Sequence, residues 1–170
     1  MTSSSAPADL EPHGDPERFR HVLSHVPTSV VVVTGTCGDT DHGMVIGSFT
    51  SISLDPQLVG FYPANTSTSW PPIRDVGRFC VNVLAQGQGE LAGRFARKGG
   101  DKFAGLEFDR APHTGAPIIP GIVAWIDCVL DREIELGDHS LVVGRVMDLC
   151  VSQSEHPMVF SRGAYPSLGD

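Results

Sequence analysis

The chain has 170 residues, a formal net charge of -8, 41% hydrophobic residues and 19% charged residues. This length and composition predict one globular domain that is large enough to bury a sizeable core. The acidic balance argues against a nucleic-acid-binding surface, which needs a basic patch, and no apolar run approaches the ~20 residues that a membrane span requires.

The first residues are rich in serine, proline, alanine and aspartate. Such a segment cannot bury enough apolar surface to offset the entropy of ordering, so we expect a flexible tail over 1–14 and a single domain over 15–170. The segment has neither a basic start nor an apolar h-region, which favours a cytoplasmic protein over a secreted one.

A short helix is expected next, because Asp15 can cap it, Pro16 suits its first position and Pro27 stops it. Its apolar residues recur at helical spacing, and this face is expected to pack against the rest of the protein. The face comprises Phe19, Val22, Leu23 and Val26.

The following segments have the patterns of β-strands. Residues 29–34 form a continuous β-branched run that is typical of a strand covered on both sides. The stretch from His42 to Pro56 alternates with period two, and the side expected to face the core comprises Ile46, Thr50, Ile52 and Leu54. Small residues dominate the other side, where Gly47 would weaken a strand unless something approaches the backbone closely. A flat, hydrogen-bonding ligand is one explanation, and a bulge at Gly47 beside solvated serines is the other.

A polar loop over 64–69 follows a further strand over 57–62. Ser69 is placed to cap a short helix that contains Ile73 and Val76. Hydroxyl groups and free backbone amides would then converge at the start of this helix, where a phosphate is favoured. The alternative is an ordinary capped turn.

The second half of the chain continues the β pattern. An amphipathic helix is expected over 88–97, a long loop over 101–121, and strands over 78–84, 122–134, 140–150 and 158–160. So many strands separated by turn signals, with only two or three short helices, predict a mainly β protein. Its antiparallel strands are expected to form a closed or nearly closed barrel.

Several familiar functional motifs are absent from the sequence. It has no phosphate-binding loop of the P-loop type, no Rossmann fingerprint, no zinc-protease motif and no α/β-hydrolase nucleophile elbow. The cysteines are widely spaced, and we expect them to be reduced core or near-core residues. They are Cys37, Cys80, Cys128 and Cys150.

Histidine supplies the better candidates for chemistry. His21 and His25 have the i, i+4 spacing of a metal-binding pair but no carboxylate partner, so no metal site is predicted. His139 lies in a turn between two strong strands, where an imidazole can donate a hydrogen bond or a proton. An ordinary hairpin-turn residue is the alternative for His139.

Seven segments, in order and spacing, resemble the flavin reductase family, the short-chain partners of two-component flavin monooxygenases. They are PTSVVVVT (27–34), HGMVIGSFTSISLDPQLV (42–59), GRFCVNVL (77–84), LAGRFA (91–96), GAPIIPG (115–121), GDHSLVVGRV (137–146) and PMVFSRGAY (157–165). The resemblance covers roughly residues 17–168. It implies the FMN-binding split-barrel fold, which is mainly β, antiparallel and Greek-key-like, with a few short helices.

The resemblance also implies where a flavin would sit. The backbone groups expected to hydrogen-bond the edge of the isoalloxazine ring belong to Val45, Ile46, Gly47 and Ser48, with Ser51 close by. Val45 and Gly47 depart from the family, which commonly has Thr at the first position and Asn or Ser at the second.

Other parts of the implied site come from later segments. Ser67 and Ser69 match the loop that holds the flavin phosphate. A segment resembling the lining of the rest of the flavin comprises Arg94, Phe95 and Ala96. His139 matches the histidine associated with NADH binding and hydride delivery.

The implied activity is reduction of FMN or FAD by NADH, or less readily NADPH, with transfer of reduced flavin to a partner monooxygenase. The absence of a basic pair able to read a ribose phosphate favours NADH. The alternatives are a flavin-dependent oxygenase or oxidase with its own small-molecule substrate, and a non-catalytic flavin-binding module. The family also implies a homodimer that pairs across the flavin site.

Overall fold

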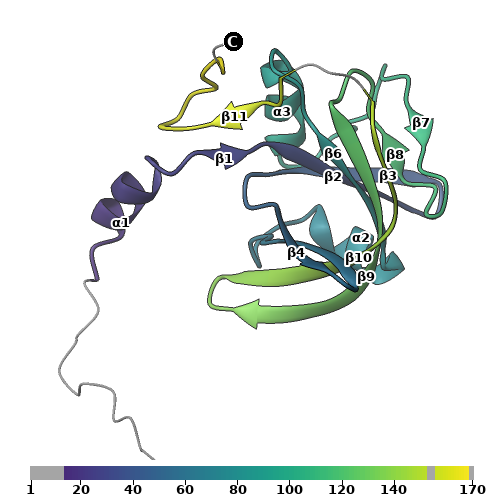
Figure 1. Cartoon of the computed structure of the whole chain (residues 1–170), viewed down its shortest axis with the longest axis horizontal. Coiled ribbons are helices and arrows are strands. Elements are labelled where there is room, and N and C mark those ends of the chain that lie inside the picture. The colour runs from purple at the N-terminus through teal and green to yellow at the C-terminus, as the bar shows by residue number, and fades with distance from the viewer. Residues whose placement is uncertain (1–13, 153–155, 169–170) are drawn as a thin grey trace, which may run out of the picture.

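The computed structural model describes residues 14–152 and 156–168 and is mainly β (Figure 1). Seven strands form one antiparallel sheet in the order β3-β2-β6-β9-β10-β5-β4. These strands are β2 (Val31–Cys37), β3 (Thr40–Ile46), β4 (Thr50–Leu54), β5 (Gln57–Phe61), β6 (Arg78–Val83), β9 (Ala124–Leu136) and β10 (His139–Val151). The tail expected over 1–14 lies outside the described residues, apart from Gly14.

The two edge strands of this sheet, β3 and β4, follow each other directly in the chain. Residues 47–49 join them, and among the described strands the two form no ladder with each other. The curled sheet therefore stays open along a seam between β3 and β4, which confirms the split barrel and shows that the barrel is not closed. The single strand expected over His42–Pro56 is wrong, because the chain crosses from one sheet edge to the other at Gly47.

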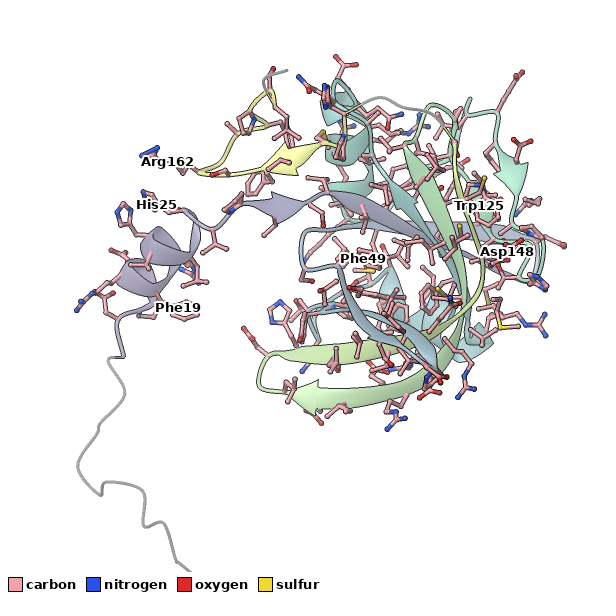
Figure 2. All side chains as sticks on the ribbon, viewed as in Figure 1. Phe19, His25, Phe49, Trp125, Asp148 and Arg162 are labelled. Carbon is pink, nitrogen blue, oxygen red and sulfur yellow. The ribbon has the colours of Figure 1, made fainter. Side chains whose placement is uncertain are left out.

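The side of this stretch expected to face the core is buried only before the seam. Ile46 is buried in β3, but Ile52 and Leu54 in β4 are 46% and 90% exposed. Phe49, from the opposite side of the predicted strand, packs against the core instead (Figure 2). The alternation of buried and exposed side chains is not continuous across the seam, because residues 47–49 are not part of a strand.

The valine run in and before β2 supplies both hydrophobic cores. Val31 and Val33 point into the barrel with Phe61 and Phe79, whereas Val30 and Val32 join a second cluster. This alternation is what period two requires of a strand covered on both faces. The prediction for residues 29–34 is therefore confirmed from Val31 to Thr34, whereas Ser29 and Val30 lie outside β2.

Two short helices pack against these cores. Helix α2 (Trp70–Val76) buries Trp70 and Ile73 on the barrel side, and α3 (Gly89–Ala96) buries Ala92 and Phe95 in the second cluster. The loop expected over 101–121 contains a two-stranded ladder of β7 (Asp109–Arg110) and β8 (Pro117–Ile118).

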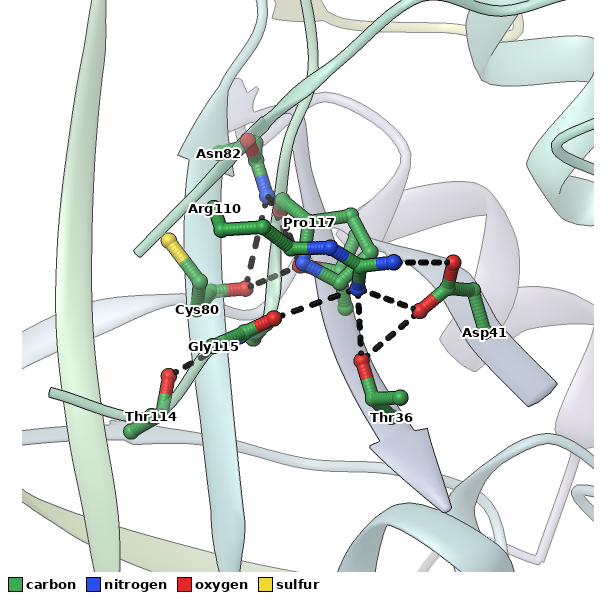
Figure 3. Close-up of polar contacts among 10 residues, drawn as sticks. Thr36, Asp41, Cys80, Asn82, Arg110, Thr114, Gly115 and Pro117 are labelled. Atoms are coloured by element: carbon green, nitrogen blue, oxygen red, sulfur yellow. Dashed lines mark hydrogen bonds and ion pairs between the residues drawn. The ribbon is translucent and has the colours of Figure 1, made fainter. Parts of the chain in front are cut away.

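Polar contacts fasten this two-stranded ladder to the main sheet (Figure 3). The buried Asn82 side chain accepts from the Ile119 amide at 2.8 Å and donates to the Pro117 carbonyl at 3.3 Å. Arg110 forms an ion pair with Asp41 at 2.7 Å. The segment after α3 is therefore held in a defined position over the barrel.

An arm stands apart from the barrel (Figure 1). It consists of α1 (Pro16–Leu23) and the ladder between β1 (Thr28–Ser29) and β11 (Val159–Phe160). Asp15 caps α1 as expected, but none of the helix's residues is buried, and Phe19 is 65% exposed (Figure 2). The expectation that this helix packs its apolar face against the protein is wrong for the isolated chain, because the helix lies beyond the edge of the barrel.

In the part of the chain that the structure describes, no helix is long and apolar enough to cross a membrane.

Candidate functional site

A cleft of 860 Å³ lies where the arm meets the seam of the barrel. Its walls come from α1, β1, the end of β3, the residues after β5, the turn before β10, and β11. The lining residues are Phe19, Leu23, Ser24, Val26, Thr28, Met44, Val45, Ile46, Gly47, Ser48, Tyr62, Ala64, Ser67, His139 and Phe160. Most of these side chains are apolar, so the cleft suits a flat ligand with a few polar edges.

The structure brings together six of the residues that the sequence singled out. They lie in three segments of the chain and share this one cleft: Val45, Ile46, Gly47, Ser48, Ser67 and His139. The other five do not line it: Ser51, Ser69, Arg94, Phe95 and Ala96. The lining residues that were not singled out as site residues from the sequence include Thr28, Met44, Tyr62 and Phe160. Thr28, Met44 and Phe160 do lie within the segments that resemble the flavin reductase family.

At the seam, Gly47 presents its backbone to the cleft. Gly47 is exposed, and among the described residues it takes part in no backbone hydrogen bond of a turn or loop. A Cβ at this position would lie 3.2 Å from Thr28 Oγ1, so a side chain would crowd the cleft wall. Unpaired peptide groups beside an apolar cleft fit the alternating donors and acceptors on the edge of an isoalloxazine ring.

Ser48 has a different role from its neighbour. Its hydroxyl oxygen accepts from the backbone N–H of Tyr62 at 2.9 Å, which links the seam to the end of β5. The Ser48 side chain therefore helps to fix the shape of the cleft, and its backbone is what remains for a ligand.

In the 64–69 loop, Ser67 rather than Ser69 caps α2. The Ser67 hydroxyl oxygen accepts from the backbone N–H groups of Ser69 and Trp70, each at 3.3 Å, and Ser69 makes no side-chain cap. The predicted cap by Ser69 is therefore wrong. The reason is that residues 67–70 form a serine turn. In this turn the hydroxyl of Ser67, two positions before Ser69, accepts from the free backbone amides at the start of the helix.

The Ser69 hydroxyl instead contacts Lys102, which sequence reasoning did not single out. Lys102 Nζ lies 3.0 Å from Ser69 Oγ and 2.9 Å from the Gly43 carbonyl oxygen. The only sequence signal was a lysine inside a segment expected to be a loop, so this contact was not predictable from spacing.

The residues expected to line the rest of the flavin lie on α3, behind β3. Phe95 is buried against Phe103, with ring centroids 5.1 Å apart, and its ring fills the space above Gly43. Arg94 donates to the Ala104 carbonyl, and Ala96 is exposed. Arg94 belongs to a second cleft of 1060 Å³ between α3 and the Gly99–Gly100 turn.

His139, the first residue of β10, faces the first cleft and is held by its neighbour Asp138. His139 Nδ1 lies 2.7 Å from Asp138 Oδ1, and this hydrogen bond, together with the charge of the imidazole, lowers the pKa of the Asp138 carboxyl. An ionised carboxylate can only accept, so Nδ1 carries the proton. Nε2 is left available to a ligand in the cleft.

His21 of α1 and His25, which follows the helix, show no metal-site geometry. The His25 ring donates from Nδ1 to the His21 carbonyl oxygen at 2.8 Å. Within 14–152 and 156–168, no group of three or more metal-ligating side chains comes together.

Comparison with known proteins places the chain in a family. The flavin reductase like domain matches residues 23–169. A flavin reductase of Pseudomonas putida is 49% identical over 152 residues, which cover 89% of each chain. The reductase subunit HsaB of a flavin-dependent monooxygenase from Rhodococcus jostii is 42% identical, over 91% of this chain and 78% of that protein.

A solved structure agrees with these sequence matches. The NADH:FAD oxidoreductase SgcE6 of Streptomyces globisporus, in complex with NAD and FAD fragments, superimposes with a TM-score of 0.87 at 33% identity. The match covers 95% of this chain and 98% of that one. The resemblance inferred from the sequence is therefore confirmed, and the chain belongs to the flavin reductase family.

Proposed function

We propose that the chain is the reductase component of a two-component flavin-dependent monooxygenase, which uses NADH to reduce a flavin for a partner oxygenase. The observation that carries the proposal is the cleft at the seam, which both the Gly47 backbone, unpaired among the described residues, and the His139 imidazole line. Gly47 follows the edge strand β3, whereas His139 begins β10, an interior strand of the same sheet. Flavin supplies the redox chemistry in this reaction, so no protein nucleophile is required.

Different residues of the cleft would bind different parts of the flavin and of the nicotinamide. The backbone from Val45 to Ser48 would orient the ring, and the apolar walls would keep water from its face. His139, oriented by Asp138, would seat the nicotinamide by hydrogen bonding through Nε2. Ser67 and Ser69 would hold the phosphate end of the flavin.

The nicotinamide preference proposed is NADH over NADPH. The cleft lining contains no lysine or arginine that could pair with a 2′-phosphate. The Streptomyces relative is named for NADH and FAD. The choice between FMN and FAD is left to measurement, and the cytoplasmic location stays a prediction.

A homodimer is proposed because the arm forms one wall of the cleft and leaves its apolar side chains exposed to solvent. The apolar face formed by Phe19 and Leu23 of α1, with Val26 just after the helix, lines the cleft, and none of the three is buried. A second copy that covered this face would close the site. Light scattering should show a dimer that Phe19→Asp combined with Leu23→Asp converts to a monomer, with Glu17→Gln on the same helix as control. A monomeric wild-type protein would overturn the dimer.

The activity is tested by mixing the protein with NADH and excess FMN or FAD and following absorbance at the nicotinamide band. We expect oxidation well above the rate with free flavin, and stimulation of a flavin-dependent monooxygenase when one is added. A yellow protein without NADH turnover would instead indicate a flavin-binding module. Oxidation of a small molecule without a second protein would indicate a self-sufficient oxygenase.

A further inference from the structure

Lys102 joins three separate elements through its side-chain ammonium group. Nζ donates to the Gly43 carbonyl of β3 at 2.9 Å, to Ser69 Oγ at 3.0 Å and to the Phe95 carbonyl of α3 at 3.1 Å. An ammonium group has three protons, so these three contacts use all of them. Every acceptor is electrically neutral.

The charge of Lys102 has no carboxylate to balance it. The side chain is half-buried, and among the described residues it forms no ion pair. Its neighbour Asp101 turns its carboxylate to the backbone N–H of Phe103, at 2.9 Å. Partial burial lowers the pKa of the Lys102 ammonium, because the charged form loses part of its hydration. Partly burying an unpaired positive charge costs folding free energy, and a bound anion nearby would offset that cost.

Ser69 is the group through which this charge can reach a ligand. Because its oxygen accepts from the ammonium, its own O–H proton is free to donate elsewhere. A hydroxyl polarised in this way is a stronger donor, since hydrogen bonds in a chain reinforce one another. Ser69 also lies in the same polar loop as Ser67, which lines the cleft at the seam.

We propose that Lys102 is the positioning residue and counter-charge for a phosphate group held by the 64–69 loop, acting through the hydroxyl of Ser69. The ligand class is a flavin that carries a phosphate, so this inference rests on the proposed function. Lys102 does not need to touch the phosphate, because its three protons are already engaged.

Comparing FMN with riboflavin separates this role from a merely structural one, because the two flavins differ only in the phosphate. Binding is measured by titrating each flavin against the apoprotein and following the quenching of flavin fluorescence. Lys102→Met should weaken FMN binding about tenfold and change riboflavin binding less than about twofold. Lys102→Arg should restore most of the FMN affinity.

Lys98→Met is the matched control, because Lys98 lies in the same segment, is exposed and makes no hydrogen bond or ion pair among the described residues. Ser69→Ala keeps the charge but removes the hydroxyl, and it should give the same FMN-selective loss. If Lys102→Met fails to fold, Ser69→Ala alone still tests whether the hydroxyl contributes to phosphate binding.

Equal losses for FMN and riboflavin in Lys102→Met and in Ser69→Ala would overturn the proposal and leave Lys102 as a structural clip. Unchanged FMN binding in both variants would also overturn it. Wild-type protein that bound neither flavin would overturn the proposed function itself, a result distinct from the two outcomes above.

Discussion

The Nδ1 atom of His139 lies 2.7 Å from Oδ1 of Asp138, where Asp138 ends the turn after β9 and His139 begins β10. Both side chains are accessible, at 44% for His139 and 96% for Asp138. The contact therefore does little for the core and instead sets which imidazole nitrogen carries the proton. The hydrogen bond to Asp138 fixes the orientation of the His139 imidazole at the rim of the cleft.

Replacing His139 with Ala should raise the KM for NADH about tenfold, because one hydrogen bond to the nicotinamide would be lost. The dissociation constant for flavin should stay within about twofold of the wild-type value, since the ring is oriented by backbone groups. Steady-state kinetics and fluorescence titration give the two values. A large loss of flavin binding with an unchanged KM would show that His139 belongs to the flavin contacts instead.

Replacing Asp138 with Asn tests the tautomer. Because its pKa is lowered, the Asp138 carboxyl stays ionised at neutral pH and below its ordinary range near ~4. The amide can donate to Nδ1 and so favour the opposite tautomer, which should raise the KM for NADH by several-fold. Asp148→Asn, a change of a half-buried aspartate elsewhere on β10, is the control. Identical kinetics in the two variants would remove any role for Asp138.

The departures at Val45 and Gly47 set how tightly flavin is held. Val45→Thr combined with Gly47→Asn adds two hydrogen-bonding side chains at the cleft wall and should tighten flavin binding. The asparagine must fit a site where a Cβ lies 3.2 Å from Thr28 Oγ1, so Thr28→Ala is included to remove that oxygen. Fluorescence titration with FMN measures the change. Unchanged affinity would mean that the backbone alone determines flavin binding here.

The sequence predicts the strands well, but it does not predict where the sheet stops. The valines before and within β2 identify a doubly covered strand, because period two is a local property. The seam at Gly47 depends on which strand edges meet after the whole sheet has curled. Local alternation carries no information on that, and so the faces assigned to Ile52 and Leu54 were wrong.

The same limit applies to the site. His139 and the 45–48 backbone were found from a turn and from the family resemblance, and the structure brings them to one cleft. Lys102 was missed because its partners are 59, 33 and 7 positions earlier in the chain, and two of its three acceptors are backbone carbonyls. A carbonyl acceptor has no side-chain signature in a sequence.

Asp127 should matter more to stability than Asp41, although both aspartates bind the segment after α3. Asp127 is fully buried and accepts from the backbone amides of His113 and Thr114 and from the Thr114 hydroxyl. Asp127→Asn leaves buried donors without an acceptor and should lower the free energy of unfolding by about 3 kcal/mol.

Asp41→Asn is the matched comparison, since it weakens an ion pair with the half-exposed Arg110 (Figure 3). Its cost should be at most about 1 kcal/mol, because solvent screens the pair. Urea unfolding followed by tryptophan fluorescence gives both values. Equal costs would show that the Asp127 contacts are replaced by water when the carboxylate is lost.

The four cysteines should differ in their reactivity toward thiol reagents according to their burial. Burial, with Asp127 nearby, raises the pKa of Cys128 to about 12 and that of the adjacent Cys80 further still. Cys150 is exposed, contrary to the expectation that every cysteine lies in or near the core. Since thiolate is the reactive form, Cys80 and Cys128 should resist an aromatic disulfide reagent at neutral pH while Cys150 reacts quickly.

Counting thiols with and without denaturant checks this division. The native protein should show one fast thiol, which Cys150→Ser removes, and a slower one from the half-buried Cys37. Urea should release the remaining two, because unfolding returns both thiols to water and restores their ordinary pKa near ~8.5. Rapid labelling of all four in the folded protein would mean that the sheet opens at β6 and β9, the two strands that carry Cys80 and Cys128. These strands lie near the middle of the sheet, so such opening would amount to unfolding of the barrel itself.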